Sequence, residues 1–92
     1  MLAEKIEAVS ALLKSISNPV RLNILCLLQE KEMTVGEIRE KLETSDANIS
    51  QHLTILRNQG IVQSRKESNF MFSRIGDERV LKLIDTLQDL FC

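Results

Sequence analysis

The chain of 92 residues has no tryptophan, no tyrosine and only three phenylalanines, although 43% of its residues are hydrophobic. A core with so few aromatic side chains must be packed mainly with leucine and isoleucine, which favours a small and mainly helical protein. No apolar run is long enough to cross a bilayer. The start of the chain shows no charged-then-apolar leader with a small-residue cleavage site. We therefore expect a single cytoplasmic domain over residues 1–92, with no membrane partner.

Residues that perform catalysis or bind metals are also scarce. The sequence has one histidine and two cysteines, Cys26 and Cys92, which lie far apart along the chain. Zinc requires three or four nitrogen or sulfur ligands, and soft metals require clustered thiolates, so one chain supplies neither set. A metal site whose ligands come from two chains remains an alternative. A thiol enzyme needs a base beside its nucleophile, and we find no phosphate loop or acid–base pair. We expect no enzyme activity, no cofactor and no metal site within one chain.

The most informative segment is Ser45–Val62, SDANISQHLTILRNQGIV. At the helical period of about 100° per residue, Ile49, Leu53 and Leu56 fall on one side and form a core face. The other side is neutral and consists of small and amide-bearing residues, namely Ala47, Asn48, Gln51, Thr54 and Asn58. Amides can pair with an adenine edge in the major groove, and small residues allow close approach. Gly60 is suited to end the helix. We interpret this segment as a recognition helix; a polar surface helix that binds nothing is the alternative.

The residues that follow predict a β-hairpin. Ile61–Lys66 begins like a strand, Glu67–Asn69 is polar and turn-forming, and Phe70–Ile75 alternates in character. Two short strands around a polar tip, directly after a recognition helix, are typical of a winged helix-turn-helix. Arg65 and Lys66 lie near the tip, where they can meet phosphates. A plain surface hairpin is the alternative.

The net charge of −1 is unusual for a nucleic-acid-binding protein, but the charges are unevenly placed. Thr44–Arg74 carries four lysines and arginines against two acids, whereas the remaining residues carry eight against eleven. The predicted DNA-binding segment, Thr44–Arg74, is therefore the basic part of the chain. Asp46 is an exception, because it suits the start of a helix but repels phosphate unless it accepts a bond from a cytosine amino group.

Four other segments have the apolar spacing of helices, and these are Leu2–Ile16, Val20–Leu28, Thr34–Leu42 and Asp77–Cys92. Asn18 followed by Pro19 suits the start of the second helix. Thr34 and Glu37 have the spacing of a capping box at the third helix, and Ser45 is a good N-cap for the recognition helix. The second helix is apolar on nearly every side, so we expect it to be central. The third leads through a short turn into the recognition helix, which is a helix-turn-helix spacing.

The first and last helices carry apolar stripes that are wide for a domain of this size. The stripe residues are Leu2, Ile6, Val9, Leu12, Leu13, Ile16, Val80, Leu81, Leu83, Ile84, Leu87, Leu90 and Phe91. We expect these helices to pack across a two-fold axis and form a homodimer. A dimer would place two recognition helices about one helical turn apart on an operator with inverted symmetry. The alternative is a monomer in which the two terminal helices cover each other.

These features resemble the ArsR/SmtB family of small dimeric bacterial repressors. The resemblance covers nearly the whole chain and rests on NPVRLNILCLL, TVGEIREKL and SDANISQHLTILRNQGIV. It implies a winged helix-turn-helix fold, binding of double-stranded operator DNA in the unliganded state, and release on sensing a metal or a chemical stress. By position, it implies DNA contacts from Ser45, Asn48, Ser50, Gln51 and His52, with Arg65 and Lys66 near the wing. A lone histidine such as His52 is more often structural or DNA-proximal than a metal ligand.

The ligand patterns of metal-sensing members do not occur in this sequence. The third helix reads VGEIRE and lacks the Cys-x-Cys pattern of arsenic and cadmium sensors. The last helix has Asp85 and Asp89 but no histidine, which zinc sensors of the family supply there. The resemblance therefore favours an inducer other than a metal.

The two cysteines instead match the branch of the family that senses redox state and reactive sulfur. That branch uses one cysteine in the second helix and one at the end of the last helix, and Cys26 in LNILCLL and Cys92 in DLFC fall at these places. The resemblance implies that an oxidant or sulfane sulfur attacks one thiol and the other resolves it. A disulfide or a longer sulfur bridge within one chain would then lower DNA affinity.

Two alternatives to this sensing mechanism remain open. Cys26 can be a buried small hydrophobe and Cys92 an incidental residue. A metal ion or a small molecule would then be the inducer. The chain can also be a winged-helix interaction module that does not bind DNA, which would lack the steep salt dependence of a repressor.

Overall fold

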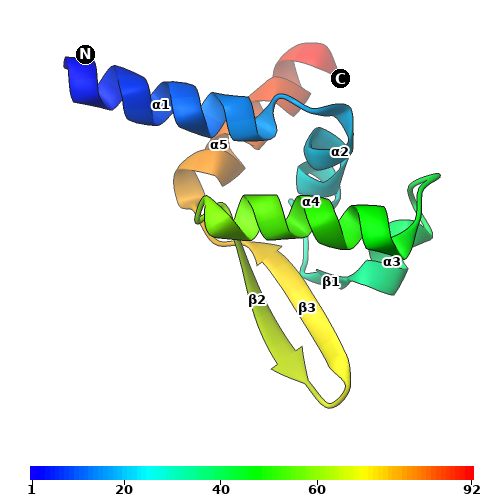
Figure 1. Ribbon diagram of the computed structural model, residues 1–92. Helices are drawn as coiled ribbons and strands as arrows, with labels where there is room; N and C mark the ends of the chain where they lie inside the picture. The colour runs from blue at the N-terminus through cyan, green and yellow to red at the C-terminus, as the bar shows by residue number, and fades with distance from the viewer.

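The computed structural model describes all 92 residues. Its helices and strands occur in the order α1 (Ala3–Ile16), α2 (Pro19–Leu27), β1 (Met33–Thr34), α3 (Val35–Arg39), α4 (Asp46–Asn58), β2 (Val62–Glu67), β3 (Phe70–Ile75) and α5 (Glu78–Phe91). The hairpin β2–β3 extends away from the helices, and both chain ends lie on the opposite side of the molecule (Figure 1). The predicted architecture, mainly helical with a winged helix-turn-helix, is confirmed.

The caps that the sequence predicted are present. Oδ1 of Asn18 accepts hydrogen bonds from the backbone amides of Val20 and Arg21, and a proline occupies the first turn of α2. Thr34 and Glu37 form a reciprocal capping box at α3. The Ser45 side chain accepts a bond from the third amide of α4. Each cap satisfies backbone donors that the helix itself leaves unpaired, so the starts of α2, α3 and α4 are fixed locally.

The hydrophobic core lies where α2, α4, α5 and the base of the sheet meet. Its buried members are Ile16, Ile24, Leu25, Leu28, Met33, Ile38, Ile49, Leu53, Leu56, Ile61, Val62, Val80 and Ile84. The predicted inner face of α4 is thus entirely buried, and burial of each such side chain contributes about 1.5–3 kcal/mol. Gly60 ends α4 at a φ of 73°, a conformation that favours glycine. This turn directs the chain into β2 and orients the hairpin relative to α4.

The sheet has three strands rather than the predicted two. β1 joins the edge of β3 in antiparallel register, with Met33 opposite Ser73 and Thr34 opposite Phe72, so the strand order is β1-β3-β2. β1 was not predicted because it has only two residues and exists through its pairing with a strand far along the chain. It attaches the base of the wing to the start of α3.

The structure also corrects the second and third helices. α2 is not buried on all sides, because Leu22 and Cys26 are exposed. α3 ends at Arg39 rather than at Leu42. After Arg39 the chain tightens, since the amides of Lys41 and Leu42 both bond to the carbonyl of Ile38. This bend turns the chain from α3 into α4.

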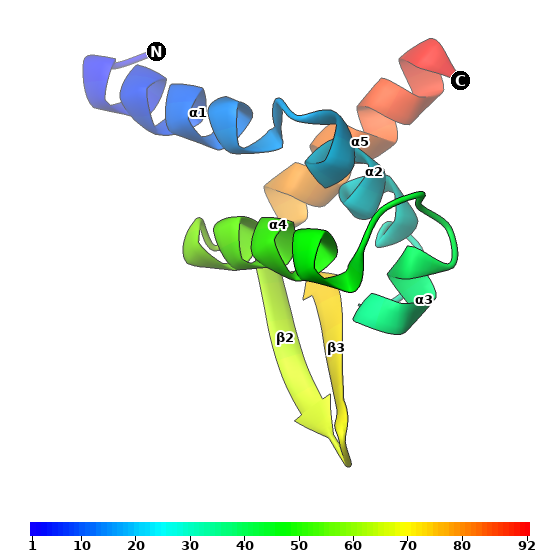
Figure 2. The ribbon, with the colours of Figure 1, turned by 45° about the vertical axis from the view of Figure 1, so that its right-hand side comes forward.

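The terminal helices leave apolar side chains uncovered. On α1, Ile6 is 51% exposed and Leu13 is 47% exposed, and at the end of α5 Leu90 and Phe91 are 71% and 80% exposed. α1 and the second half of α5 extend in different directions (Figure 2). The alternative in which these two helices cover each other within one chain is therefore wrong. None of the helices has the length and apolar character to cross a bilayer.

Candidate nucleic-acid interface and cysteine cavity

The start and outer face of α4 carry the polar side chains that the helical pattern and the family resemblance assigned to DNA contact. Ser45, Ser50, Gln51 and Thr54 are exposed, whereas Asn48 is half-buried. The side-chain amide nitrogen of Asn48 donates to the Thr44 hydroxyl at 2.8 Å, so its side-chain oxygen is not used in this bond. The Thr54 hydroxyl donates to the carbonyl of Ser50 at 2.9 Å, so its methyl group is available for apolar contact.

The acidic residue at the start of α4 is neutralised by its neighbour in the helix-turn-helix. Asp46 forms an ion pair of 2.5 Å with Nε of Arg39, at the end of α3. The pair is exposed and contributes under about 1 kcal/mol to stability. Its importance is local, because it offsets the negative charge that would otherwise face a phosphate backbone.

His52 connects α4 to the neighbouring helix α2. Its Nδ1 lies 3.1 Å from a guanidinium nitrogen of Arg21, whose Nε donates to the carbonyl of Ser15 at 2.5 Å. Arginine only donates hydrogen bonds, so Nδ1 is the acceptor and the neutral imidazole carries its proton on Nε2. Burial, and secondarily the charge of Arg21, lower the pKa of His52 below its ordinary value. The structure gives His52 a structural contact; a DNA contact from this residue stays a prediction.

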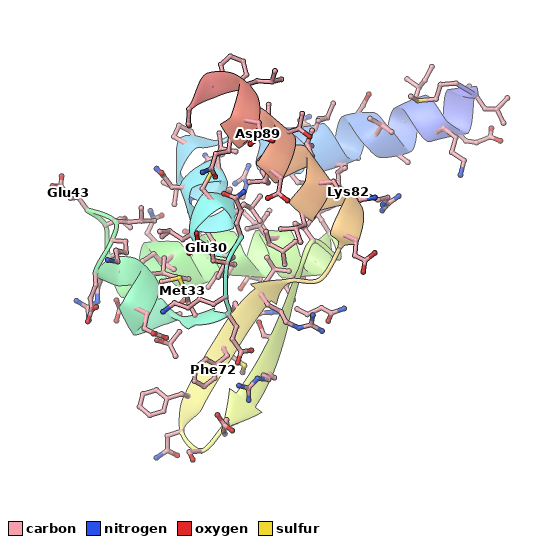
Figure 3. The ribbon with its side chains drawn as sticks, turned by 180° about the vertical axis from the view of Figure 1, so that it is seen from behind. Glu30, Met33, Glu43, Phe72, Lys82 and Asp89 are labelled. Atoms are coloured by element: carbon pink, nitrogen blue, oxygen red, sulfur yellow. The ribbon has the colours of Figure 1, made fainter.

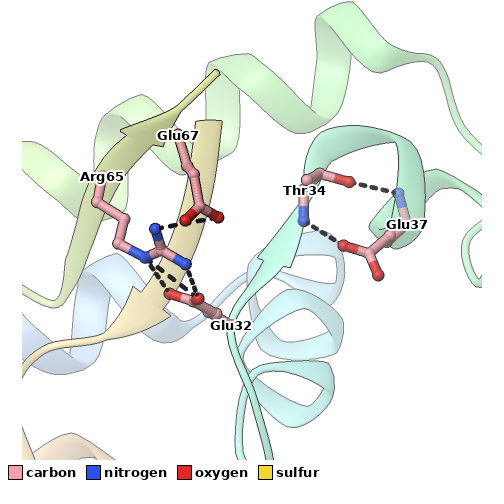
Figure 4. A network of polar contacts seen from close by, with 5 residues as sticks. All are labelled: Glu32, Thr34, Glu37, Arg65 and Glu67. Carbon is pink, nitrogen blue, oxygen red and sulfur yellow. Dashed lines mark hydrogen bonds and ion pairs between the residues drawn. The ribbon is translucent and has the colours of Figure 1, made fainter. Parts of the chain in front are cut away.

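The wing has a charge network that the sequence did not reveal. Nε of Arg65 lies 2.9 Å from one carboxylate oxygen of Glu32 and 3.2 Å from the other, and a second guanidinium nitrogen also donates to this carboxylate (Figure 4). Glu67 adds an ion pair at 3.5 Å, and the guanidinium stacks 4.7 Å from the centroid of the Phe72 ring. These carboxylates raise the pKa of Arg65. Arg65 is thus already paired in the free protein.

The other basic residues of the Thr44–Arg74 segment differ in whether their side chains have hydrogen-bond or ion-pair partners. Lys66, at the next position of β2, is exposed and has no ion pair among those of the structure. Nε of Arg57, at the end of α4, donates to the Ser64 hydroxyl at 3.2 Å. Arg74 donates to Gln63 at 2.7 Å across the hairpin. Arg57 and Arg74 were counted only as charges in the sequence, and both hydrogen-bond to residues of β2 near the base of the wing.

The fold brings the two cysteines to one cavity. Cys26 lies in the last turn of α2 and Cys92 directly follows α5. Both thiols are free and exposed, and both line a cavity of about 430 Å³. Its other lining residues are Leu22, Ile84, Leu87, Gln88 and Phe91. Partial desolvation of the Cys26 thiol by the protein around it, and secondarily the neighbouring Cys92, raise its pKa. The alternative in which Cys26 is a buried hydrophobe is wrong, because this position is exposed.

A second cavity of about 600 Å³ adjoins the first and is acidic. Cys26 and Gln88 line both cavities, and the second is bordered by Glu30, Asp85 and Asp89. The Glu30 and Asp89 side chains lie on the same side of the molecule, in the turn after α2 and on α5 (Figure 3). The three carboxylates do not form an arrangement that could hold a metal ion.

Residues 18–64, which extend from the cap of α2 into β2, match the family described as bacterial regulatory protein, arsR family. This chain belongs to the ArsR family. It is 42% identical over 81 residues to the transcriptional activator HlyU of Vibrio cholerae, covering 88% of this chain and 75% of that protein. It is 38% identical over 84 residues to the biofilm growth-associated repressor of Agrobacterium fabrum, covering 91% and 72%.

Solved structures of ArsR-family regulators have the same fold. HlyU from Vibrio cholerae N16961 superimposes with a TM-score of 0.95 at 37% identity, over 99% of each chain. The homodimeric winged helix-turn-helix DNA-binding domain of a possible ArsR-family regulator from Mycobacterium bovis superimposes with a TM-score of 0.85 at 30% identity, over 96% of this chain and 82% of that one. The chain is therefore a DNA-binding transcriptional regulator with a winged helix-turn-helix and not an enzyme.

Proposed function

We propose that this ArsR-family regulator is a homodimeric repressor that binds an inverted-repeat operator and releases it when Cys26 and Cys92 are bridged. The observation that carries the proposal is that both cysteines, one from α2 and one from the end of α5, line a single cavity.

The exposed face of α4 supports operator binding. Gln51 offers an exposed amide for paired hydrogen bonds to an adenine edge, and the side-chain oxygen of Asn48 is not used in its bond to Thr44. Ser45 and Ser50 suit phosphate or base contacts at the start of the helix. Thr54 completes this face, the half-buried His52 lies at its edge, and Lys66 extends it onto the wing as a phosphate contact. Arg65 supports DNA binding indirectly, because its guanidinium is paired with Glu32 and holds the wing in place.

The uncovered apolar residues on the terminal helices support a dimer. Leu13 of α1 and Phe91 of α5 belong to exposed apolar surfaces that a second copy of the chain can cover. The Mycobacterium bovis relative is a homodimer, which agrees with this assembly. A two-fold axis would present two copies of α4 to successive major-groove turns of an inverted repeat.

The cysteine cavity suggests how a chemical signal reaches the DNA. A thiolate attacks a sulfur atom of a polysulfide, expels a shorter sulfide anion and becomes a persulfide. The second thiolate attacks the persulfide and expels hydrosulfide, so two thiols lose two electrons and the sulfane sulfur is reduced. A longer bridge retains additional sulfur atoms. Either bridge ties α5 to α2 and changes the dimer angle, and therefore the spacing of the two α4 helices.

Two other functions predict different behaviour. If the cysteines are inert and a metal ion or small molecule is the inducer, thiol-blocked protein would still respond to that inducer. If the domain is a protein-interaction module, it would show no salt-dependent DNA binding, whereas a repressor loses affinity steeply with salt.

The test begins with the selection of an operator from random double-stranded DNA. Fluorescence anisotropy with that operator then compares the wild type with Cys26→Ser and Cys92→Ser, each before and after treatment with inorganic polysulfide. We expect all three reduced proteins to bind, and only the wild type to release DNA after treatment. Release by either single variant would contradict the proposal. Recovery of sequences without inverted symmetry would contradict the dimeric mode of binding.

A further inference from the structure

We propose that the cysteine cavity selects small, uncharged and apolar sulfur electrophiles, such as dialkyl trisulfides, and discriminates against anionic ones. This inference rests on the proposed function, since it names the class of inducer that reaches the same two thiols fastest. Inorganic polysulfide is an anion, so it reacts more slowly than an uncharged donor does, although it still forms the bridge. It follows from three features of the cavity: its lining, its acidic neighbour and the helix ends that border it.

The lining of the cavity favours an apolar ligand. Apart from Gln88, the residues around the two thiols are the aliphatic or aromatic side chains of Leu22, Ile84, Leu87 and Phe91. No lysine or arginine lines this cavity or the acidic one beside it. Anionic ligands in proteins are held by such cations or by several amide donors, whereas an anion entering this cavity would lose water and find only the Gln88 amide as a side-chain donor in the lining.

The acidic neighbour adds electrostatic repulsion. Cys26 belongs to both cavities, so a reagent that reacts with it comes close to the carboxylates of Glu30, Asp85 and Asp89. Asp85 is held in place by a hydrogen bond of 2.7 Å from the Gln29 side chain. Like charges within a Debye length of about 8 Å are only partly screened at physiological salt, so these groups disfavour an anionic reagent.

The helix ends act in the same direction. Cys26 is in the last turn of α2, and Cys92 is the C-cap of α5. The C-terminal end of a helix carries about half a negative charge, which attracts cations and repels anions. Neither thiol therefore has the positive environment that prepares a cysteine for an anionic substrate.

An uncharged trisulfide, R–S–S–S–R, suits this site and its chemistry balances. One thiolate attacks the central sulfur, forms a bond to it and expels R–S⁻. The second thiolate attacks the same central sulfur and expels the other R–S⁻. Two thiols and one trisulfide thus give a trisulfide bridge between Cys26 and Cys92 and two molecules of R–SH, with the two cysteine protons ending on the released thiolates.

The experiment compares three methanethiosulfonates that share one reactive group: the uncharged methyl, the anionic sulfonatoethyl and the cationic trimethylammonioethyl reagents. The rate constant of each reagent is measured at Cys26 in the Cys92→Ser variant and at Cys92 in the Cys26→Ser variant. Each rate constant is then divided by that of the same reagent with an uncharged small thiol in solution. We expect the anionic reagent to be disfavoured relative to the methyl reagent by about three- to tenfold at Cys26. An equal or higher normalised rate for the anionic reagent would overturn the inference.

A second variant tests the cause of the selectivity. Asp85→Asn with Asp89→Asn removes two charges while keeping an oxygen acceptor for Gln29. In the Cys92→Ser background, we expect this variant to lose most of the discrimination. Glu4→Gln with Glu7→Gln, the same charge change on α1, should keep it. An unchanged selectivity in the Asp85 and Asp89 variant would overturn the electrostatic assignment.

The inference and the proposed function can fail separately. Dimethyl trisulfide and its analogue with two carboxyethyl groups are compared for bridge formation and for operator release. Equal bridging by both reagents would refute the charge selectivity and leave the sensing role intact. Preferential bridging by dimethyl trisulfide without loss of operator binding would support the selectivity and refute the proposed release mechanism.

Discussion

The guanidinium of Arg65 is bound to the carboxylate of Glu32 through two of its nitrogen atoms. Arg65 belongs to the wing, whereas Glu32 precedes β1, so this contact fastens the hairpin to the connection that leads into the helix-turn-helix. In the free protein, the positive charge of Arg65 is therefore already balanced by the carboxylate of Glu32. The wing therefore meets DNA with Lys66 as its unpaired cation near the tip.

Removal of the Glu32 charge should strengthen binding to DNA of any sequence. In Glu32→Gln the Arg65 guanidinium keeps a hydrogen-bond acceptor but gains a net positive charge that can reach a phosphate. We expect affinity for operator and non-operator duplexes to rise by about two- to fivefold, with a salt dependence steeper by about one phosphate. Anisotropy titrations across a range of salt concentrations measure both. Glu7→Gln is the matched control, and identical behaviour of the two variants would refute the charge compensation.

Replacement of Lys66 should have the opposite and sequence-independent effect. Lys66→Gln removes the exposed cation of β2 that has no ion pair, without removing a contact that holds the wing. We expect weaker binding to operator and non-operator DNA by similar factors, and a salt slope smaller by about 1. The same titrations test this prediction. A loss restricted to the operator would instead make Lys66 a base-reading residue.

Truncation of Gln51 should affect the operator alone. Its exposed amide lies on the outer face of α4, and Gln51→Ala removes a bidentate partner for a base. We expect operator affinity to fall by about 1–3 kcal/mol with non-specific binding unchanged. Asn23→Ala, which removes an exposed amide from α2, serves as the control. Competition between operator and random duplexes gives the ratio, and a uniform loss would exclude direct readout by this residue.

The single histidine should make stability depend on pH between neutral and mildly acidic conditions. The pKa of His52 is lower in the folded chain than its ordinary value of about 6.5 in an unfolded one. The unfolded chain therefore binds the proton first, so the stabilisation is complete above about pH 6.5 and is lost as the pH falls through the folded pKa. Urea unfolding at several pH values, compared with His52→Gln, measures it.

An NMR titration supplies the site-specific reading, because no other histidine resonance is present. Arg21→Leu removes the cation 3.1 Å from Nδ1 and should raise the pKa of His52. A pKa above the ordinary value in the wild type would contradict the buried contact with Arg21.

Local patterns in the sequence predicted α4 well because the information for this helix lies within it. Ile49, Leu53 and Leu56 have helical spacing, and the Ser45 cap and Gly60 terminator are close by, so each signal acts over a few residues. The same holds for the capping box of α3. The family resemblance was confirmed for the same reason, since its most specific motif covers this helix and its flanks.

The features that were missed depend on residues that meet only after folding. β1 has two residues and is defined by its pairing with β3. The Arg65–Glu32 contact joins residues with no local relationship in the sequence. The exposed side of α2 was missed because its residues are apolar, and apolar composition alone does not show that Cys26 faces a cavity. The sequence indicated which cysteines to consider, but their common cavity is a property of the packing of α2 and α5.

Intact-mass spectrometry of the reduced protein, before and after treatment with inorganic polysulfide, tests the central claim most directly. We predict that both thiols become inaccessible to alkylation. Each monomer should lose the mass of two hydrogen atoms and gain that of any sulfur retained in the bridge. Peptide mapping should show Cys26 linked to Cys92 of the same chain. Two thiols that remain free, or only adducts between chains, would contradict the account and make the pair structural.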